Sequence, residues 1–132
     1  MRHGLLALVL AVVAGGLALA ADPVRAAQEA VIAPAELRRI ELLVQAIEQS
    51  TGMHFIRNGV AYNAKTAANF LRLKWSQGRD RVHTAADFVR EIGSKSGTTG
   101  IRYRVKNADG SEEDSAAFLG RLLAAQARVP SK

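Results

Sequence analysis

Residues 53–62 read MHFIRNGVAY, and they set the fold because Asn58-Gly59 separates two short runs of residues that favour β-strands. Asparagine followed by glycine is the strongest short signal for a type I′ hairpin turn, since both turn positions need a positive φ. A two-residue turn at this point fixes the strand register and predicts that Phe55 lies opposite Tyr62. The other elements are assigned outward from this hairpin.

Four helices are predicted around the hairpin, because apolar residues recur there at helical spacing. The first begins at Pro34, since a proline at the first helical position needs no N–H. The second follows Asn63 as N-cap, and the third starts at Thr84 with Asp87 completing a capping box. The fourth is capped by Asp114 or Ser115. The predicted core residues are Leu37, Ile40, Leu43, Val44 and Ile47 in the first helix, Ala64, Ala67, Ala68, Leu71 and Trp75 in the second, Ala85, Phe88, Val89 and Ile92 in the third, and Phe118, Leu119, Leu122, Ala125 and Val129 in the fourth.

A further strand is predicted over residues 101–106, where apolar and basic residues alternate with period two. The alternation places Ile101, Tyr103 and Val105 on the core face. The sequence therefore predicts an α+β fold of four helices with a small antiparallel sheet, made of the 53–62 hairpin and the 101–106 strand.

The first 20 residues have the features of a secretory signal peptide. A short basic start precedes an apolar run, and Ala18-Leu19-Ala20 supplies the small residues that signal peptidase accepts. An uncleaved membrane anchor is the alternative, but the run is short for a span of roughly 20 apolar residues. We therefore expect a signal peptide (1–20), a flexible leader (21–33) and a single α+β domain (34–129), in a protein that is periplasmic or secreted.

The composition restricts the classes of function. The chain has 132 residues, no cysteine and a formal net charge of +6. Without cysteine there can be no disulfide, thiolate nucleophile or iron–sulfur cluster held by cysteine. An exported basic protein meets lipid phosphates, lipopolysaccharide and wall polymers rather than nucleic acid, so we expect no nucleic-acid partner and no membrane span after cleavage of the signal peptide.

The order of motifs resembles the YfeK-like family, a group of small exported bacterial proteins of unknown function. The similarity extends over roughly residues 37–123, and Phe118 stands where a tryptophan is expected. The resemblance implies a periplasmic location and a shared fold, and it implies no activity. The matching stretches are Phe55-Ile56-Arg57-Asn58-Gly59 with Tyr62, Ala67-Ala68, Leu71-Arg72-Leu73-Lys74, Thr84-Ala85 with Phe88, Ser94-Lys95-Ser96, Tyr103 with Val105, and Asp109-Gly110 with Leu119.

Three groups of residues are candidate sites. Arg102, Arg104 and Lys106 share the outer face of the predicted strand and are candidates for binding an anion. Ser94, Lys95 and Ser96 form a polar loop that is superficially similar to Ser/Lys nucleophilic sites, although a loop after the third helix is the simpler interpretation. Phe70 and Leu73 lie off the main apolar stripe of the second helix. They indicate either a helix packed on two sides or a face for a partner protein.

No metal or cofactor is expected, because His54 and His83 lack companions at ligand spacing. The preferred hypothesis is a non-enzymatic periplasmic binding or accessory protein that contacts an anionic envelope polymer or lipid headgroups. The alternatives are a hydrolase that uses the Ser/Lys loop, or a protein-interaction subunit whose partner is another periplasmic protein.

Overall fold

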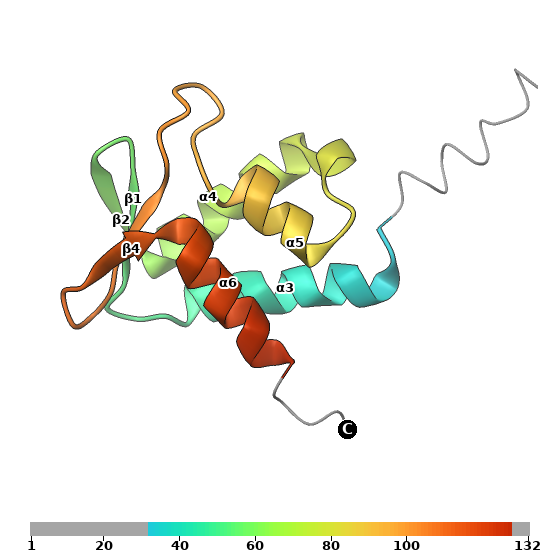
Figure 1. Ribbon diagram of the computed structural model, residues 1–132, viewed down its shortest axis with the longest axis horizontal. Helices are drawn as coiled ribbons and strands as arrows, with labels where there is room; N and C mark the ends of the chain where they lie inside the picture. The colour runs from blue at the N-terminus through green and yellow to red at the C-terminus, as the bar shows by residue number, and fades with distance from the viewer. Residues whose placement is uncertain (1–31, 128–132) are drawn as a thin grey trace, which may run out of the picture. The chain divides into compact units, whose positions relative to one another are not determined.

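The sheet is antiparallel and has four strands in the order β2-β1-β3-β4 (Figure 1). The computed structural model describes residues 32–127. Within this range four helices lie beside the sheet, so the predicted α+β fold is confirmed. The strands are β1 (His54–Arg57), β2 (Val60–Asn63), β3 (Arg104–Lys106) and β4 (Glu112–Asp114).

The β1–β2 hairpin has the predicted turn and register. Asn58 and Gly59 adopt φ values of 49° and 82°, as a type I′ turn requires. Phe55 pairs with Tyr62 and Arg57 with Val60. The local sequence is sufficient here because the turn alone sets which residues face each other.

Gly59 offers a direct test of the turn. We expect Gly59→Val to destabilise the protein by about 1 kcal/mol or more, because a β-branched residue resists a positive φ. A Cβ at Gly59 would meet no atom within 4 Å, so the loss comes from the backbone rather than from a clash. Urea denaturation measures it, with Gly97→Val as control, because Gly97 is equally open and lacks the positive φ. Equal losses in the two variants would contradict the assignment.

The helices begin where their capping residues predict. Proline opens α3 (Pro34–Glu48), and Asn63 Oδ1 accepts a hydrogen bond from Thr66 N at 2.9 Å to cap α4 (Ala64–Gln77). Thr84 and Asp87 form the full capping box of α5 (Ala85–Asp87). This helix continues as the π-helical η2 (Phe88–Ile92), and a 3-10 turn, η1 (Arg79–Arg81), precedes it. The last helix is α6 (Ser115–Gln126).

The core is formed by the helices and one face of the sheet. The predicted stripe of α4 is buried along its whole length, from Ala64 to Trp75. Phe55, Tyr103 and Val105 of the sheet side are each 1% exposed or less. The other predicted core residues that are buried are Ile40, Leu43, Val44 and Ile47 of α3, Ala85 of α5, Phe88 and Ile92 of η2, and Phe118 and Leu119 of α6. Leu37, Val89 and Leu122 are only partly buried, and the prediction for Ala125 is wrong, because it is exposed.

The predicted 101–106 strand is shorter than expected, and the inward orientation of Ile101 is wrong. The strand β3 begins only at Arg104, and the side chain of Ile101 is 55% exposed. The chain turns just before it, because Gly100 adopts a φ of 73° and Ser96 N donates to Ile101 O. The turn therefore holds Ile101 in a loop outside the sheet.

The strand β4 was not anticipated, because its three residues, Glu112-Glu113-Asp114, are poor strand formers. They form a strand because a turn at Gly110 (φ 89°) returns the chain alongside β3. Lys106 then lies opposite Glu112, and Arg104 opposite Asp114. Attraction between opposite charges on facing strand positions stabilises β4, although its residues have a low intrinsic strand propensity.

Two groups of predictions lie outside the described residues. The signal peptide, nearly all of the leader and the core position Val129 belong to segments 1–31 and 128–132. Between residues 32 and 127, no helix combines the length and the apolar character needed to cross a membrane.

Candidate functional site

The basic strand proposed as an anion site has a counter-ion on the neighbouring strand β4. Arg104 donates to Asp114 Oδ1 at 2.7 Å, and Arg102 donates to Asp114 Oδ2 at 3.1 Å. The hydrogen bonds from these two guanidinium groups, that from Arg104 first, lower the pKa of the Asp114 carboxyl. Asp114 is thus the counter-ion of both arginines and links β4 to the strand region before it.

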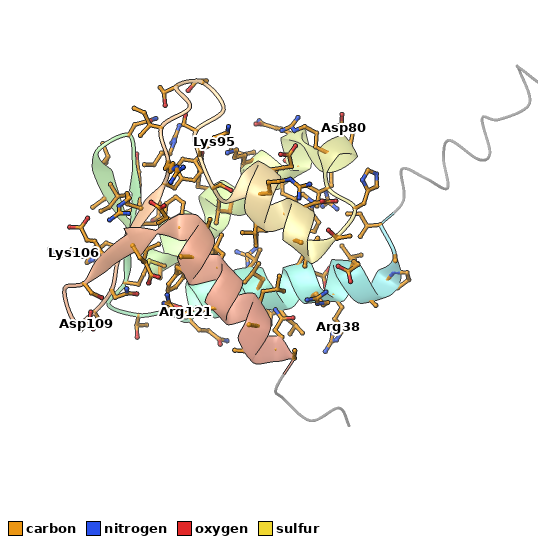
Figure 2. The ribbon with its side chains drawn as sticks, in the orientation of Figure 1. Arg38, Asp80, Lys95, Lys106, Asp109 and Arg121 are labelled. Atoms are coloured by element: carbon orange, nitrogen blue, oxygen red, sulfur yellow. The ribbon has the colours of Figure 1, made fainter. Side chains whose placement is uncertain are left out.

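Lys106 stands apart from this ion-pair cluster. It lies at the end of β3 next to the turn to β4, close to Asp109 in Figure 2. Glu112 is its cross-strand neighbour. The three residues of the predicted anion site therefore share a face with the acidic strand β4, which reduces their net positive charge.

The hydroxyl groups of the polar loop bond within the loop and to the end of the preceding helix. Ser94 Oγ lies 2.6 Å from Val89 O and 2.8 Å from Arg90 O and donates to these carbonyls. Ser96 is 4% exposed, and its Oγ accepts from the N–H groups of Thr98 and Thr99. Within residues 32–127 neither hydroxyl bonds the Lys95 ammonium. Ser94, Lys95 and Ser96 are therefore neighbours in the chain, but they form no hydrogen-bonded Ser/Lys pair among the described residues.

A lysine outside the predicted groups joins this loop to α4. Lys74 Nζ donates to Lys95 O at 2.7 Å and to the Tyr103 hydroxyl at 3.0 Å. Burial, followed by the charges of Arg81 and Arg57, lowers the pKa of Lys74 to about 8. The region around Lys74 is therefore positively charged and has no carboxylate bonded to it among the described residues.

A groove opens between the β1–β2 hairpin and α4, and it has a volume of about 330 Å³. Its surface is mainly apolar, with Phe55 and Ala67 at the buried end and Leu73 at the rim, where 58% of the leucine is exposed. The lining residues are Phe55, Arg57, Tyr62, Thr66, Ala67, Asn69, Phe70 and Leu73.

Phe70 and Leu73 have different surroundings on this face of α4. Phe70 is partly buried, and its ring centroid lies 6.5 Å from that of Phe55 and 5.9 Å from that of Tyr103. Leu73 is one of the large apolar side chains left on the surface. The face is therefore packed on its inner side and open on its outer side.

Arg57 adds a charge to the groove. Its guanidinium carbon lies 4.3 Å from the centroid of the Phe70 ring, a cation–π distance. Among residues 32–127 it forms no ion pair. Arg57 and Lys74 belong to none of the three candidate groups that the sequence indicates. The sequence does carry a signal for Lys74, which lies four residues after Phe70. This spacing puts Phe70, Leu73 and Lys74 at neighbouring positions on one helix face.

Histidines do not contribute a ligand cluster to the described part of the chain. His54 and His83 are both exposed. No three His, Asp or Glu side chains between residues 32 and 127 are arranged to hold a metal ion.

Comparison with known proteins gives two matches in sequence. The profile of a Family of unknown function (DUF5329) matches residues 34–127. The Uncharacterized protein YfeK of Salmonella typhimurium is 38% identical over 68 residues, which cover 52% of this chain and 57% of that protein. The chain thus matches little more than half the length of this curated relative. No solved structure matches the chain.

Proposed function

The chain belongs to the Family of unknown function (DUF5329), and from this premise we propose that it is a non-enzymatic periplasmic accessory protein that binds a partner protein through the groove between β1–β2 and α4. The resemblance to the YfeK-like family is confirmed by the two sequence matches. Because that family brings no activity with it, the proposal depends on the surface itself.

The observation that carries the proposal is an apolar groove flanked by Arg57, which forms no ion pair with any residue from 32 to 127. Aromatic and arginine side chains carry much of the affinity in protein interfaces, and the groove presents Tyr62, Phe70 and Arg57 beside the exposed Leu73. The positive charge of Arg57 favours an acidic partner. The proposal thus still includes attraction to a negatively charged partner, as the sequence suggested.

The groove supports this function better than the basic strand does. Arg102 and Arg104 already share the Asp114 carboxylate, so an external anion would compete with an internal one. A lipid headgroup or wall polymer would be held mainly by charge, whereas most of the groove lining is apolar. A folded partner protein offers both apolar side chains and carboxylates.

The test compares two leucines of the same chemistry on different faces. Leu73 lies at the groove and Leu42, which is 37% exposed, lies on α3. We expect Leu73→Asp to weaken the binding of an envelope protein to the immobilised mature chain at least tenfold, because binding would desolvate a carboxylate beside the apolar lining of the groove. We expect Leu42→Asp to bind as the wild type does. The affinity of the retained protein is measured by titration.

Two results would contradict the proposal. One is an equal loss of binding in both variants while their melting temperatures stay unchanged. The other is sedimentation of the wild type with anionic vesicles that Arg102→Gln, Arg104→Gln and Lys106→Gln together abolish, because the basic strand would then be the site.

A further inference from the structure

The two edges of the sheet differ in how they are protected. The edge strand β4 consists of Glu112-Glu113-Asp114, and charged residues discourage pairing with another chain. The other edge strand, β2, consists of Val60-Ala61-Tyr62-Asn63 and contains no charge and no proline. Val60 is 52% exposed. The strand β2 is therefore an edge that can accept a further strand.

The groove lies beside this unprotected edge. Tyr62 of β2 lines it on one side, and Thr66, Asn69 and Leu73 of α4 line it on the other. Side chains of a strand alternate between the two faces of a sheet. A strand added next to β2 would direct every second side chain to the α4 side, where the groove is open.

We propose that an extended segment of the partner adds to β2 as a fifth strand, with apolar side chains at alternate positions in the groove and a carboxylate near Arg57. This inference rests on the proposed function and names the way in which the groove is used. Addition of a strand to a sheet edge is a common mode of peptide recognition, in which main-chain hydrogen bonds give affinity and pockets select the side chains.

The charge of the surface selects an acidic segment over a second copy of this chain. Arg57 has no carboxylate partner among the described residues, and Lys74 lies in the same positive region. The chain as a whole carries a formal charge of +6, so two copies repel each other. A segment with apolar residues and flanking carboxylates matches both the groove and its charge.

Ala61 is the position at which strand addition can be blocked without changing the groove. Alternate residues of an edge strand direct their N–H and C=O away from the neighbouring strand. Because Arg57 and Val60 close the two-residue turn and face each other, Ala61 is the residue whose main chain points outward. A proline at such a position removes only a solvent-facing N–H, which edge strands tolerate.

The probe is a labelled seven-residue peptide with valine at positions two, four and six, threonine at three and five, and glutamate at both ends. We expect it to bind the mature protein and to slow hydrogen exchange of the Ala61 amide at least tenfold. We expect Ala61→Pro and Leu73→Asp to weaken binding at least tenfold each, and Ala61→Ser to leave it unchanged. Arg57→Gln should weaken binding more at low salt than at high salt.

A second measurement uses the wild-type protein and does not depend on the folding of a variant. One peptide is N-methylated at the valine amides and another at the threonine amides, since only one alternate set can bond to β2. We expect one of the two peptides to lose binding and the other to keep it. Equal affinities would overturn strand addition.

The outcomes separate this inference from the proposed function. If Leu73→Asp abolishes partner binding while Ala61→Pro does not, the groove is used without strand addition and only the inference fails. Absence of peptide binding at millimolar concentration also overturns the inference. If the free protein forms dimers that Ala61→Pro disrupts, the strand comes from a second copy and the acidic partner is wrong.

Discussion

Tyr103→Ala is expected to destabilise the protein by about 3–5 kcal/mol, the range for removing a large aromatic side chain from a core. Tyr103 is 1% exposed, and its ring centroid lies 5.0 Å from that of Phe55. Its hydroxyl accepts a hydrogen bond from Lys74, which also donates to Lys95 O in the 94–103 loop. The loss therefore affects the sheet, the helix α4 and the 94–103 loop together.

The control for this variant is Tyr103→Phe, which keeps the ring and removes only the hydroxyl. Lys74 retains its bond to Lys95 O, so we expect the loss to be about 1 kcal/mol. Urea denaturation followed by circular dichroism measures both variants. If Tyr103→Phe lost as much stability as Tyr103→Ala, the hydroxyl contact rather than the aromatic packing would dominate.

Trp75→Ala is the second substitution with a large expected effect, again about 3–5 kcal/mol. Trp75 is 5% exposed and packs edge-on against Phe88, with ring centroids 5.6 Å apart. The guanidinium carbon of Arg79 lies 3.8 Å from the centroid of the indole. Truncation leaves a void between α4 and η2 and removes the platform beneath Arg79.

Trp75→Phe tests how much of this loss comes from the aromatic contact with Phe88. The indole Nε1 is buried and has no partner among the described residues, so its removal leaves no acceptor unsatisfied. We expect Trp75→Phe to cost clearly less than the alanine variant, because the ring contact with Phe88 is kept in part. Circular dichroism follows the unfolding, since this is the only tryptophan of the chain. Equal losses in the two variants would show that packing against Phe88 contributes little.

The basic strand shows how a correct pattern can lead to an incomplete conclusion about a site. The alternation of residues 101–106 correctly placed Tyr103 and Val105 in the core. It also led to the hypothesis that Arg102, Arg104 and Lys106 bind an external anion. Their counter-ion is Asp114, and no spacing rule predicts that an acidic run after a turn pairs back onto this strand.

For the groove, the sequence indicates two of the residues, Phe70 and Leu73, but not how they are arranged with the hairpin. Phe70 and Leu73 were singled out because they leave the main stripe of their helix. Whether they were buried depended on what covers that face, and the structure shows that Phe55 and Tyr103 cover Phe70 whereas Leu73 stays exposed. Arg57 reaches the Phe70 ring from β1.

The sequence by itself determined the features that depend on neighbours within a few residues. The Asn58-Gly59 turn set the hairpin register, and Pro34, Asn63 and the capping box at Thr84 set the starts of three helices. These signals are local, because a turn needs particular φ values and a cap bonds N–H groups two or three positions away.

Only the tertiary structure decided the acidic strand β4, the exposed position of Ile101, and the groove between the hairpin and α4. Each of these depends on side chains that are distant in sequence and meet only when the chain is folded. Such contacts outweigh the intrinsic strand propensity of a residue, because a strand is stabilised mainly by the side chains across from it. The exposure of a helix face likewise depends on what packs against it, which the period of the sequence does not encode.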